Sequence, residues 1–272
     1  MNTQSFDGSL YRYGGKMSTS IVLLAYNEAE NLKILLPKIN EEIKKICKDY
    51  EILIIDSAEP TDCTQAVAEA NGAKYIAQEE PFYGGAFRTG IKYAAKERML
   101  VLDADGSHDP KNISDLHKKF EEGYDMVIGS RYVKGGISND SKSSFIMSKI
   151  LNTTMRLIIG VKAKDISTSY RLYDTKQIKA VELHCNNYDV LQEVILKMKI
   201  NKRSDKQKFY IGEVPIVFNK RMYGVSKRRL VEFIKGYIVT AFTLLGLNIC
   251  SIIKNKRNFK VFLLFSLTLV GK

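Results

Sequence analysis

Short apolar runs alternate along the chain with segments of helical periodicity. The runs are too short for helices and are typical of buried strands, at 21–25 (IVLLA), 52–55 (ILII), 99–102 (MLVL) and 126–128 (MVI). Between the first two, apolar residues recur at positions 32, 35, 36, 39, 43 and 46, which predicts an amphipathic helix. Pro37 falls inside this pattern, so the helix either begins late or is kinked there. Further helices are expected over 64–71, 86–95 and 111–122.

The alternation of strand and helix predicts an α/β fold, with a mostly parallel central sheet and helices on both faces. In such sheets, ligands bind beyond the carboxyl ends of the strands. Polar residues follow four of the predicted strands: Tyr26, Asn27 and Glu28 after the first, Asp56 after the second, Asp103 and Asp105 after the third, and Ser130 and Arg131 after the fourth. We therefore expect the functional site at this edge of the sheet.

The stretch LDADGSHDP at 102–110 is the most informative part of the chain. Asp103 and Asp105 are two positions apart at the end of a buried strand, so their carboxylates can converge. Two close carboxylates repel each other unless a cation lies between them. Mg²⁺ or Mn²⁺ suits this arrangement, because hard cations bind one or two carboxylates together with substrate phosphates. The alternative is a solvated loop that turns at Asp109 and Pro110.

Composition limits the class of protein, and the distribution of charge adds a candidate partner. The 272 residues are 45% hydrophobic and 26% charged, which excludes a disordered chain and a polytopic membrane protein. The chain carries 42 Lys and Arg against 30 Asp and Glu, a net charge of +12. The whole excess lies in residues 197–272, with 17 basic and 3 acidic side chains. Anionic lipid, phosphorylated substrate and nucleic acid are the partners that this charge admits.

The basic C-terminal quarter also contains the longest apolar segments. The run at 238–253 would span about 24 Å as a helix, less than the roughly 30 Å of a bilayer core. A shorter run at 261–270 follows, and basic residues separate and flank the two. This pattern is typical of an interfacial anchor on an anionic membrane surface. A helix packed on the catalytic domain or in a dimer, and a tilted transmembrane helix, are the alternatives.

The N-terminus and the cysteines exclude other classes. Residues 1–16 are polar, lack the apolar segment of a secretory signal and are expected to form a flexible extension before Met17. The four cysteines are far apart without a CxxC pair, and the histidines form no HExxH motif. A zinc site or a disulfide framework is therefore not expected, and a reducing, cytosolic setting fits.

Five ordered segments resemble family 2 glycosyltransferases, in particular the type that acts on dolichyl or other polyprenyl phosphates. They are AYNEAENL at 25–32, DADGSHDP at 103–110, GSRYVKGG at 129–136, DISTSYRLY at 165–173 and EVPIVFNKRMYGVSKRR at 213–229. The resemblance implies a GT-A fold over residues 17–230, followed by a membrane-associating tail over 231–272. It also implies an activity, the transfer of a sugar from a nucleotide-sugar donor such as a UDP- or GDP-sugar.

By the same resemblance, individual residues acquire roles in donor binding. The nucleoside would be held by Tyr26, Glu28 and Asp56, and the diphosphate with its divalent cation by Asp103, Ala104 and Asp105. Ser107 stands where relatives often place a further metal ligand, although a hydroxyl is a weaker ligand. The segment at 54–64 departs from the family pattern, since Ser57 replaces an aspartate and one residue is inserted. This departure leaves the nucleobase open.

The acceptor follows from the charges that the motifs contain. A phosphate monoester is already an anionic nucleophile and needs cations rather than a base, and the resemblance places Arg131, Arg221 and Lys227 in phosphate-binding motifs. A hydroxyl acceptor would need a general base, and Glu193 stands near the position of that acid in relatives that act on hydroxyls. As an alternative, Glu193 positions a loop or pairs with a lysine. The expected catalytic residues are thus Asp103, Asp105, Arg131 and Glu193.

We expect a metal-dependent, inverting transfer to a polyprenyl phosphate, at the cytoplasmic face of the membrane. The alternative acceptor is a hydroxyl of a cell-surface glycan. A nucleic-acid-binding module is disfavoured, because the basic residues are interleaved with long apolar runs and no RNP, KH or helix-turn-helix signature is present. A nucleotidyltransferase would carry a glycine-rich, basic loop after the first strand, where this chain has AYNEAEN. Self-association is left open.

Overall fold

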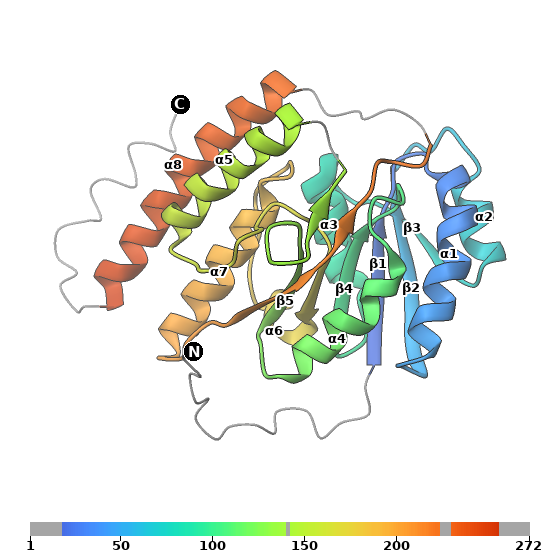
Figure 1. Cartoon of the computed structure of the whole chain (residues 1–272), viewed down its shortest axis with the longest axis horizontal. Helices are drawn as coiled ribbons and strands as arrows, with labels where there is room; N and C mark the ends of the chain where they lie inside the picture. The colour runs from blue at the N-terminus through green and yellow to red at the C-terminus, as the bar shows by residue number, and fades with distance from the viewer. Residues whose placement is uncertain (1–17, 140–141, 224–229, 256–272) are drawn as a thin grey trace.

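The computed structural model describes residues 18–139, 142–223 and 230–255, and its centre is a seven-stranded sheet in the order β3-β2-β1-β4-β7-β5-β8 (Figure 1). Six of these strands are parallel, and β7 is antiparallel to both of its neighbours. The strands are β1 (Ser18–Leu24), β2 (Asp49–Asp56), β3 (Lys74–Ala77), β4 (Arg98–Asp103), β5 (Met126–Ser130), β7 (Arg171–Asp174) and β8 (Ile211–Pro215). Two further strands, β6 (Ile137–Ser138) and β9 (Val217–Phe218), form a separate parallel pair. The predicted α/β fold with a mostly parallel sheet is confirmed.

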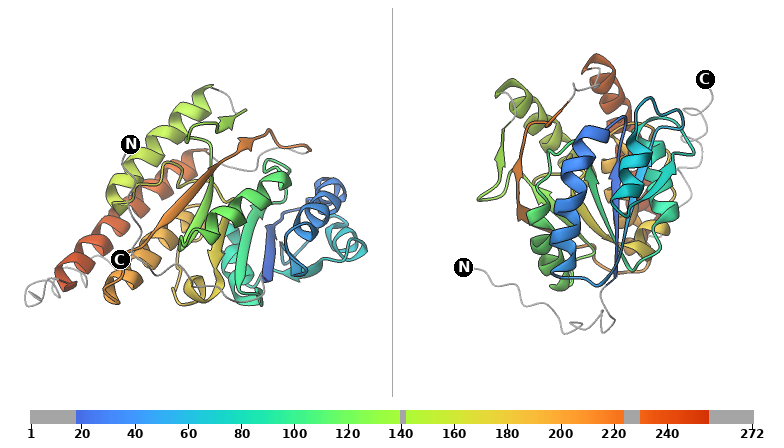
Figure 2. Two further views of the ribbon diagram at one scale, coloured as in Figure 1. Left: turned by 60° about the horizontal axis from the view of Figure 1, so that its bottom comes forward. Right: turned by 90° about the vertical axis from the view of Figure 1, so that its right-hand side faces the viewer.

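Helices cover both faces of the sheet. They are α1 (Ala29–Lys44), α2 (Thr64–Ala70), α3 (Phe82–Tyr93), α4 (Ile113–Glu121), α5 (Lys142–Ile159), α6 (Thr175–Lys179), α7 (Val190–Ser204) and α8 (Leu230–Asn255), with a short 3-10 helix at Pro110–Asn112. Alternate residues of β1 face opposite layers: Ile21 and Leu23 pack with α1, α2 and α4, whereas Val22 and Leu24 pack with α3 and α7 (Figure 2). The central strand is therefore buried on both faces, as its continuous apolar sequence predicts.

The predicted helices are present, with two differences at their bounds. Helix α1 runs through Pro37 without a late start, and its apolar stripe is buried as expected. Helix α3 begins at Phe82, four residues before the expected start at 86. The sequence predicts a later start because the first turn contains two glycines, which have low helix propensity. Gly84 is required there: a Cβ atom at this position would lie 2.0 Å from the carbonyl oxygen of Cys185.

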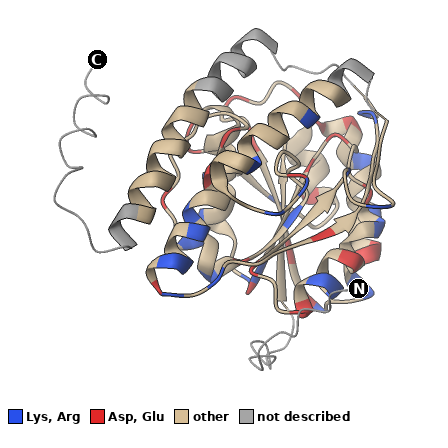
Figure 3. Cartoon of the chain, turned by 60° about the vertical axis from the view of Figure 1, so that its left-hand side comes forward, with Lys and Arg blue, Asp and Glu red and all other residues tan. Residues whose placement is uncertain are grey.

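Helices α5 and α8 lie side by side at one end of the molecule (Figure 1). The inward side of α8 carries polar groups, since Thr240 Oγ1 donates to Asp189 Oδ2 (2.5 Å) and Asn248 Nδ2 donates to the carbonyl oxygen of Ile158 (2.7 Å). Its outward side is apolar, with Phe242 73% exposed and Val239 66% exposed. No charged residue occurs over 239–252, so this part of α8 is tan in Figure 3. The inward side of helix α8 thus combines these polar groups with the buried Leu244, whereas its outward side is largely apolar.

Some of the expected features fall outside this description. The N-terminal extension at 1–16, the second apolar run at 261–270 and Lys227 lie outside the described residues. Within the described ranges, no helix has both the length and the hydropathy that crossing a bilayer requires.

Candidate functional site

The polar residues that follow β1, β2 and β4 meet at one edge of the sheet because these strands are neighbours. Leu24 is in register with both Ile55 and Asp103. The strand pairing continues beyond β1, since the amide of Ala25 donates to Ile55 (2.8 Å) and the amide of Ala104 donates to Leu24 (3.3 Å). This register brings Glu28, Asp56 and the Asp103 loop to a common edge, as the sequence predicts.

Asp56, the last residue of β2, is fully buried at this edge. Its Oδ1 accepts the amide N–H of Asn27 at 3.4 Å. The Tyr75 hydroxyl also interacts with this carboxyl group, but no hydrogen bond of normal geometry reaches Oδ2 among the described residues. Burial raises the pKa of Asp56 above its ordinary value. Beside it, Tyr26 is 52% exposed and Asn27 has a left-handed backbone conformation with φ of 56°. A buried acceptor without a partner next to an exposed ring suits a polar ligand such as a nucleoside.

The loop after β4 is fixed by a neutral histidine. Burial lowers the pKa of His108 to about 4, so its ring is uncharged at neutral pH. Its Nδ1 can therefore accept the amide N–H of Asp103, at 3.2 Å. Asp105 Oδ1 accepts the amide of Ser107 at 3.0 Å, while the Ser107 hydroxyl is buried and has no hydrogen-bond partner among the described residues.

These groups fit a hard divalent cation that arrives with a diphosphate. Within the described ranges, no group of three or more His, Cys, Asp and Glu side chains forms a complete metal site. Mg²⁺ and Mn²⁺ do not require one, because one or two carboxylates suffice when substrate phosphates and water complete the shell. Asp103 and Asp105 are two carboxylates that such an ion could bind, and the Ser107 hydroxyl is a buried oxygen that a ligand could satisfy.

Residues 219–223, which we call the strap, cross this loop. Backbone hydrogen bonds hold the strap, from the amide of Met222 to Asp105 (3.1 Å) and from the amide of Asn219 to Ser107 (2.9 Å). The Arg221 guanidinium donates from Nη1 to Glu28 Oε1 at 2.6 Å, and its Nη2 lies 3.4 Å from Asp105 Oδ2. The strap thus connects the polar ends of β1 and β4.

Glu28 is buried beneath Arg221. Its second oxygen, Oε2, accepts from Asn31 Nδ2 at 2.5 Å. Burial raises the pKa of Glu28, and this effect exceeds the lowering by Arg221 and Asn31. The carboxyl group is therefore easier to protonate than an ordinary glutamate, even though it contacts an arginine.

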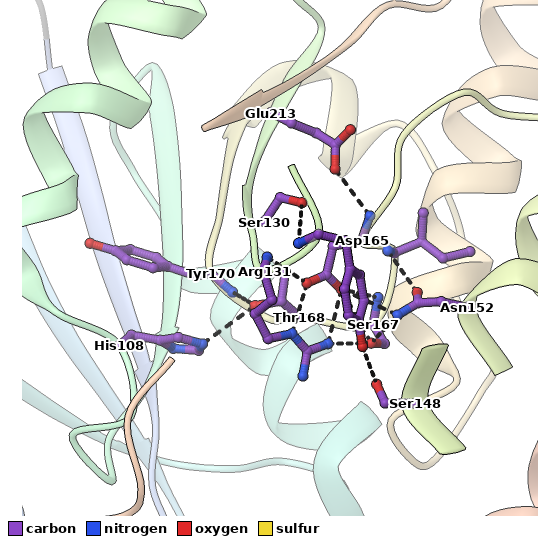
Figure 4. Close-up of polar contacts among 12 residues, drawn as sticks. His108, Ser130, Arg131, Ser148, Asn152, Asp165, Ser167, Thr168, Tyr170 and Glu213 are labelled. Atoms are coloured by element: carbon purple, nitrogen blue, oxygen red, sulfur yellow. Dashed lines mark hydrogen bonds and ion pairs between the residues drawn. The ribbon is translucent and has the colours of Figure 1, made fainter. Parts of the chain in front are cut away.

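Arg131, at the end of β5, is clamped by Asp165 (Figure 4). Asp165 accepts from the backbone N of Arg131 (3.0 Å), from Nε (2.8 Å) and from Nη2 (3.0 Å), and Ser167 Oγ accepts from Nη2 (2.7 Å). The guanidinium also lies over the rings of Tyr132 and Phe218, 5.1 and 5.2 Å from their centroids. Burial would raise the pKa of Asp165, but the interactions with Arg131 and the backbone amides outweigh it, so that this pKa is lowered.

A second layer of side chains holds Asp165 and its loop. Asn152 of α5 donates from Nδ2 to Ser167 Oγ (3.0 Å) and accepts from the amide of Ile166 (2.9 Å), while Glu213 accepts from the amide of Asp165 (3.0 Å). Sequence reasoning gave none of these residues a role. Asp165 lies in a recognised motif, which was a usable signal, whereas no local pattern distinguishes Asn152.

Glu193 lies in the first turn of α7 and anchors a loop. Its carboxylate accepts the amide N–H groups of His184 (3.0 Å) and Cys185 (2.8 Å) and pairs with Lys197 Nζ at 2.8 Å. Burial would raise the pKa of Glu193, but Lys197 and the two amides outweigh it and this pKa is lowered. These contacts match the alternative in which Glu193 positions a loop and pairs with a lysine. Its catalytic role stays a prediction.

Comparison with known proteins gives matches over most of the chain. Residues 20–181 match the family described as Glycosyl transferase family 2. The polyprenol monophosphomannose synthase of Mycolicibacterium smegmatis is 30% identical over 225 residues, which are 77% of this chain and 80% of that protein. The dolichol-phosphate mannosyltransferase of Pyrococcus furiosus is also 30% identical, over 78% of this chain, but the match spans only 59% of that longer protein.

Solved structures agree with this fold. The glucosyl-3-phosphoglycerate synthase from Mycobacterium tuberculosis, in complex with Mn²⁺ and UDP-glucose, superimposes with a TM-score of 0.65 over 90% of this chain and 85% of that chain. A second structure of that protein, with phosphoglyceric acid, also gives a TM-score of 0.65, with 17% sequence identity. At this low identity the likeness extends to the GT-A fold alone.

Proposed function

Because this chain belongs to glycosyl transferase family 2 and is thus a glycosyltransferase, we propose that it moves a sugar from a nucleotide-sugar donor to a polyprenyl phosphate. Two relatives at 30% identity are named for such lipid acceptors. The transfer is a single displacement with inversion, in which a phosphate oxygen of the acceptor attacks the anomeric carbon. That step develops positive charge on the sugar and negative charge on the departing diphosphate.

The acids at the strand ends bind the donor. Tyr26, Asp56 and Glu28 contact the nucleoside of a UDP- or GDP-sugar. Mg²⁺ or Mn²⁺, when bound, neutralises the negative charge of the leaving diphosphate. The residues that hold this cation are Asp103 and Asp105, with Ser107 beside them, and the backbone of Ala104 lines the same loop.

The fixed position of Arg131, held by Asp165, is the main support for a phosphate acceptor. The Arg131 guanidinium, with Arg221 and Lys227 from the motif that follows β9, supplies cations for a phosphate monoester, which attacks without a general base. Glu193, the residue expected to act as a base on a hydroxyl, is engaged by two backbone amides and Lys197. A phosphate acceptor therefore suits these side chains better than a glycan hydroxyl does.

The polarity of α8 supports attachment to an anionic membrane surface. Exposed apolar side chains such as Val239 and Phe242 line the outward side of this helix, and the chain carries its excess of basic residues in the same region. The four free cysteines, of which Cys63 is exposed, are compatible with the reducing side of the membrane. We place the enzyme at the cytoplasmic face for these reasons.

A matched pair of acceptors tests the function. The full chain in detergent would be given UDP- and GDP-sugars with Mg²⁺ or Mn²⁺, and either a polyprenyl phosphate or the polyprenol of the same length. We expect a glycolipid from the phosphate alone, and almost no product from Asp105→Asn, which keeps the shape of the side chain but loses its charge. Transfer to the free alcohol, or turnover of Asp105→Asn within a few-fold of wild type, would contradict the proposal.

A further inference from the structure

Arg221 bridges two carboxylates that come from different strand ends. Its Nη1 contacts Glu28 Oε1 at 2.6 Å, and its Nη2 lies 3.4 Å from Asp105 Oδ2. The side chain of Arg221 is 26% exposed, so solvent reaches the guanidinium and exchange of its partners needs no unfolding. These carboxylates are the ones to which the proposed function assigns the nucleoside and the divalent cation.

The strap keeps its place without this side chain. Its amides at Asn219 and Met222 donate to the loop carbonyls, and the amide of Tyr223 donates to Asn31 Oδ1 at 3.0 Å. The Met222 side chain also covers Gly106, where an added Cβ atom would lie 2.3 Å from the Met222 Cε. The guanidinium can therefore leave its carboxylates while the backbone of the strap stays on the loop.

A cation and Arg221 compete for Asp105. Asp105 Oδ1 already accepts the amide of Ser107, so Oδ2, the oxygen that faces Arg221, is the more available ligand. A divalent cation bound to that oxygen would face the positive guanidinium, and like charges at such a distance repel. A donor diphosphate brings the cation to this oxygen, so the guanidinium is released and can pair with another phosphate.

We propose that Arg221, held by Glu28, occupies the place of the donor's cation beside Asp105 until the donor complex displaces it toward the acceptor phosphate. This inference rests on the proposed function. It makes Arg221 the link between two steps, because the residue becomes available to the acceptor only after the donor has bound. Donor binding would thus precede productive acceptor binding.

The inference predicts effects of opposite sign for one substitution. Arg221→Gln removes a competitor of the cation, so we expect Mn²⁺ to bind more tightly by about fivefold or more, the lower end of typical coupling between two sites. The same variant should transfer sugar to a polyprenyl phosphate more slowly. A residue that only contacts the acceptor phosphate would slow transfer and leave Mn²⁺ binding unchanged.

Electron paramagnetic resonance of free Mn²⁺, titrated against the full chain in the absence of any nucleotide, measures this binding without turnover. Lys220→Gln is the matched control, because it removes the same charge from the neighbouring, exposed position of the strap. We expect Lys220→Gln to bind Mn²⁺ like wild type, and Arg221→Lys, which keeps the charge but cannot bridge both acids, to fall between wild type and Arg221→Gln. Equal affinities for Arg221→Gln and Lys220→Gln, or weaker binding by Arg221→Gln, would overturn the inference.

A second measurement separates this inference from the proposed function. If wild type transfers sugar but Arg221→Gln has an unchanged Mn²⁺ affinity, the competition between Arg221 and the cation is refuted and the proposed function is retained. Tighter Mn²⁺ binding by Arg221→Gln in a protein that transfers no sugar to any polyprenyl phosphate would refute the acceptor assignment and retain the competition. Absence of Mn²⁺ binding in wild type and in Arg221→Gln alike would overturn the competition, whereas the proposed function is overturned only by failure of the sugar transfer itself.

Discussion

Arg131 and Arg221 present two guanidinium groups to one edge of the sheet, but the protein holds them in different ways. Arg131 is nearly buried, and one fully buried carboxylate, Asp165, accepts from its backbone and from two of its side-chain nitrogens. Arg221 is more exposed and is divided between Glu28 at 2.6 Å and Asp105 at 3.4 Å. The first arrangement fixes a cation in advance, whereas the second permits a change of partner.

The pKa shifts of the partner acids express the same difference. Burial acts to raise the pKa of both Asp165 and Glu28. For Asp165, the contacts with Arg131 and the backbone amides exceed this effect and the pKa is lowered. For Glu28, the contacts with Arg221 and Asn31 do not exceed it and the pKa is raised. The fold therefore makes Asp165 harder to protonate, and Glu28 easier to protonate, than an ordinary carboxylic acid of the same kind.

The largest expected effect comes from breaking the Arg131 clamp. Asp165→Asn leaves a buried guanidinium without its counter-ion, which typically costs about 3–5 kcal/mol of unfolding free energy. Arg221→Gln should cost less, because its guanidinium is partly exposed and the Glu28 carboxyl that it leaves behind keeps its bond to Asn31 and has a raised pKa. Chemical denaturation of both variants measures the two values. Equal losses would mean that the two arginines are held alike and would remove the basis of the comparison.

A smaller effect is expected on turnover when each arginine is replaced by lysine. Arg131→Lys keeps the charge but loses the two-pronged contact with Asp165, so we expect turnover to fall about 100-fold, or roughly 2.7 kcal/mol in the barrier. Arg221→Lys should lose only about tenfold, because a flexible ammonium can still reach an incoming phosphate. Initial rates at saturating donor, over a range of polyprenyl phosphate concentrations, test the order. A greater loss in Arg221→Lys would reverse our interpretation of which arginine is fixed.

How well each part of the site could be predicted depends on the sequence distance of its contacts. The sheet edge with Glu28, Asp56 and Asp103 follows from local pattern, because aliphatic runs identify β1, β2 and β4, and the polar residues come at or just after the end of each run. The Arg131–Asp165 pair joins residues 34 positions apart, and Arg221–Glu28 joins residues 193 apart. Periodicity carries no information about such pairs, so only the family motifs indicated that these segments take part.

Short and mixed elements were missed for a related reason. Strand β7, RLYD, has four residues, two of them charged, and therefore shows no apolar run. Its place between β4 and β5 is fixed by antiparallel pairing with both. In α8 the sequence predicts an apolar helix, but which side faces outward depends on where Thr240 and Asn248 find partners.

The smallest expected effect is a difference in the pH dependence of stability between the two acids. Asp165 has a lowered pKa in the folded protein, so its contribution is present above its ordinary pKa of 3.8 and is lost as the pH falls through the lower folded value. The difference in unfolding free energy between wild type and Asp165→Asn should thus stay constant from about pH 5 to about pH 8 and become smaller only in stronger acid.

Glu28 should behave in the opposite way. Its folded pKa lies above the ordinary value of 4.5, so its contribution is complete below that value and is lost as the pH rises through the folded pKa. Wild type should therefore lose stability relative to the non-titrating Glu28→Gln as the pH is raised above 4.5, whereas Asp165→Asn shows no such trend there. Denaturation midpoints of wild type, Glu28→Gln and Asp165→Asn, taken at a series of pH values above 4.5, would measure these differences in stability. A gap between wild type and Glu28→Gln that moves the other way would mean that Arg221 holds Glu28 as firmly as Asp165 holds Arg131.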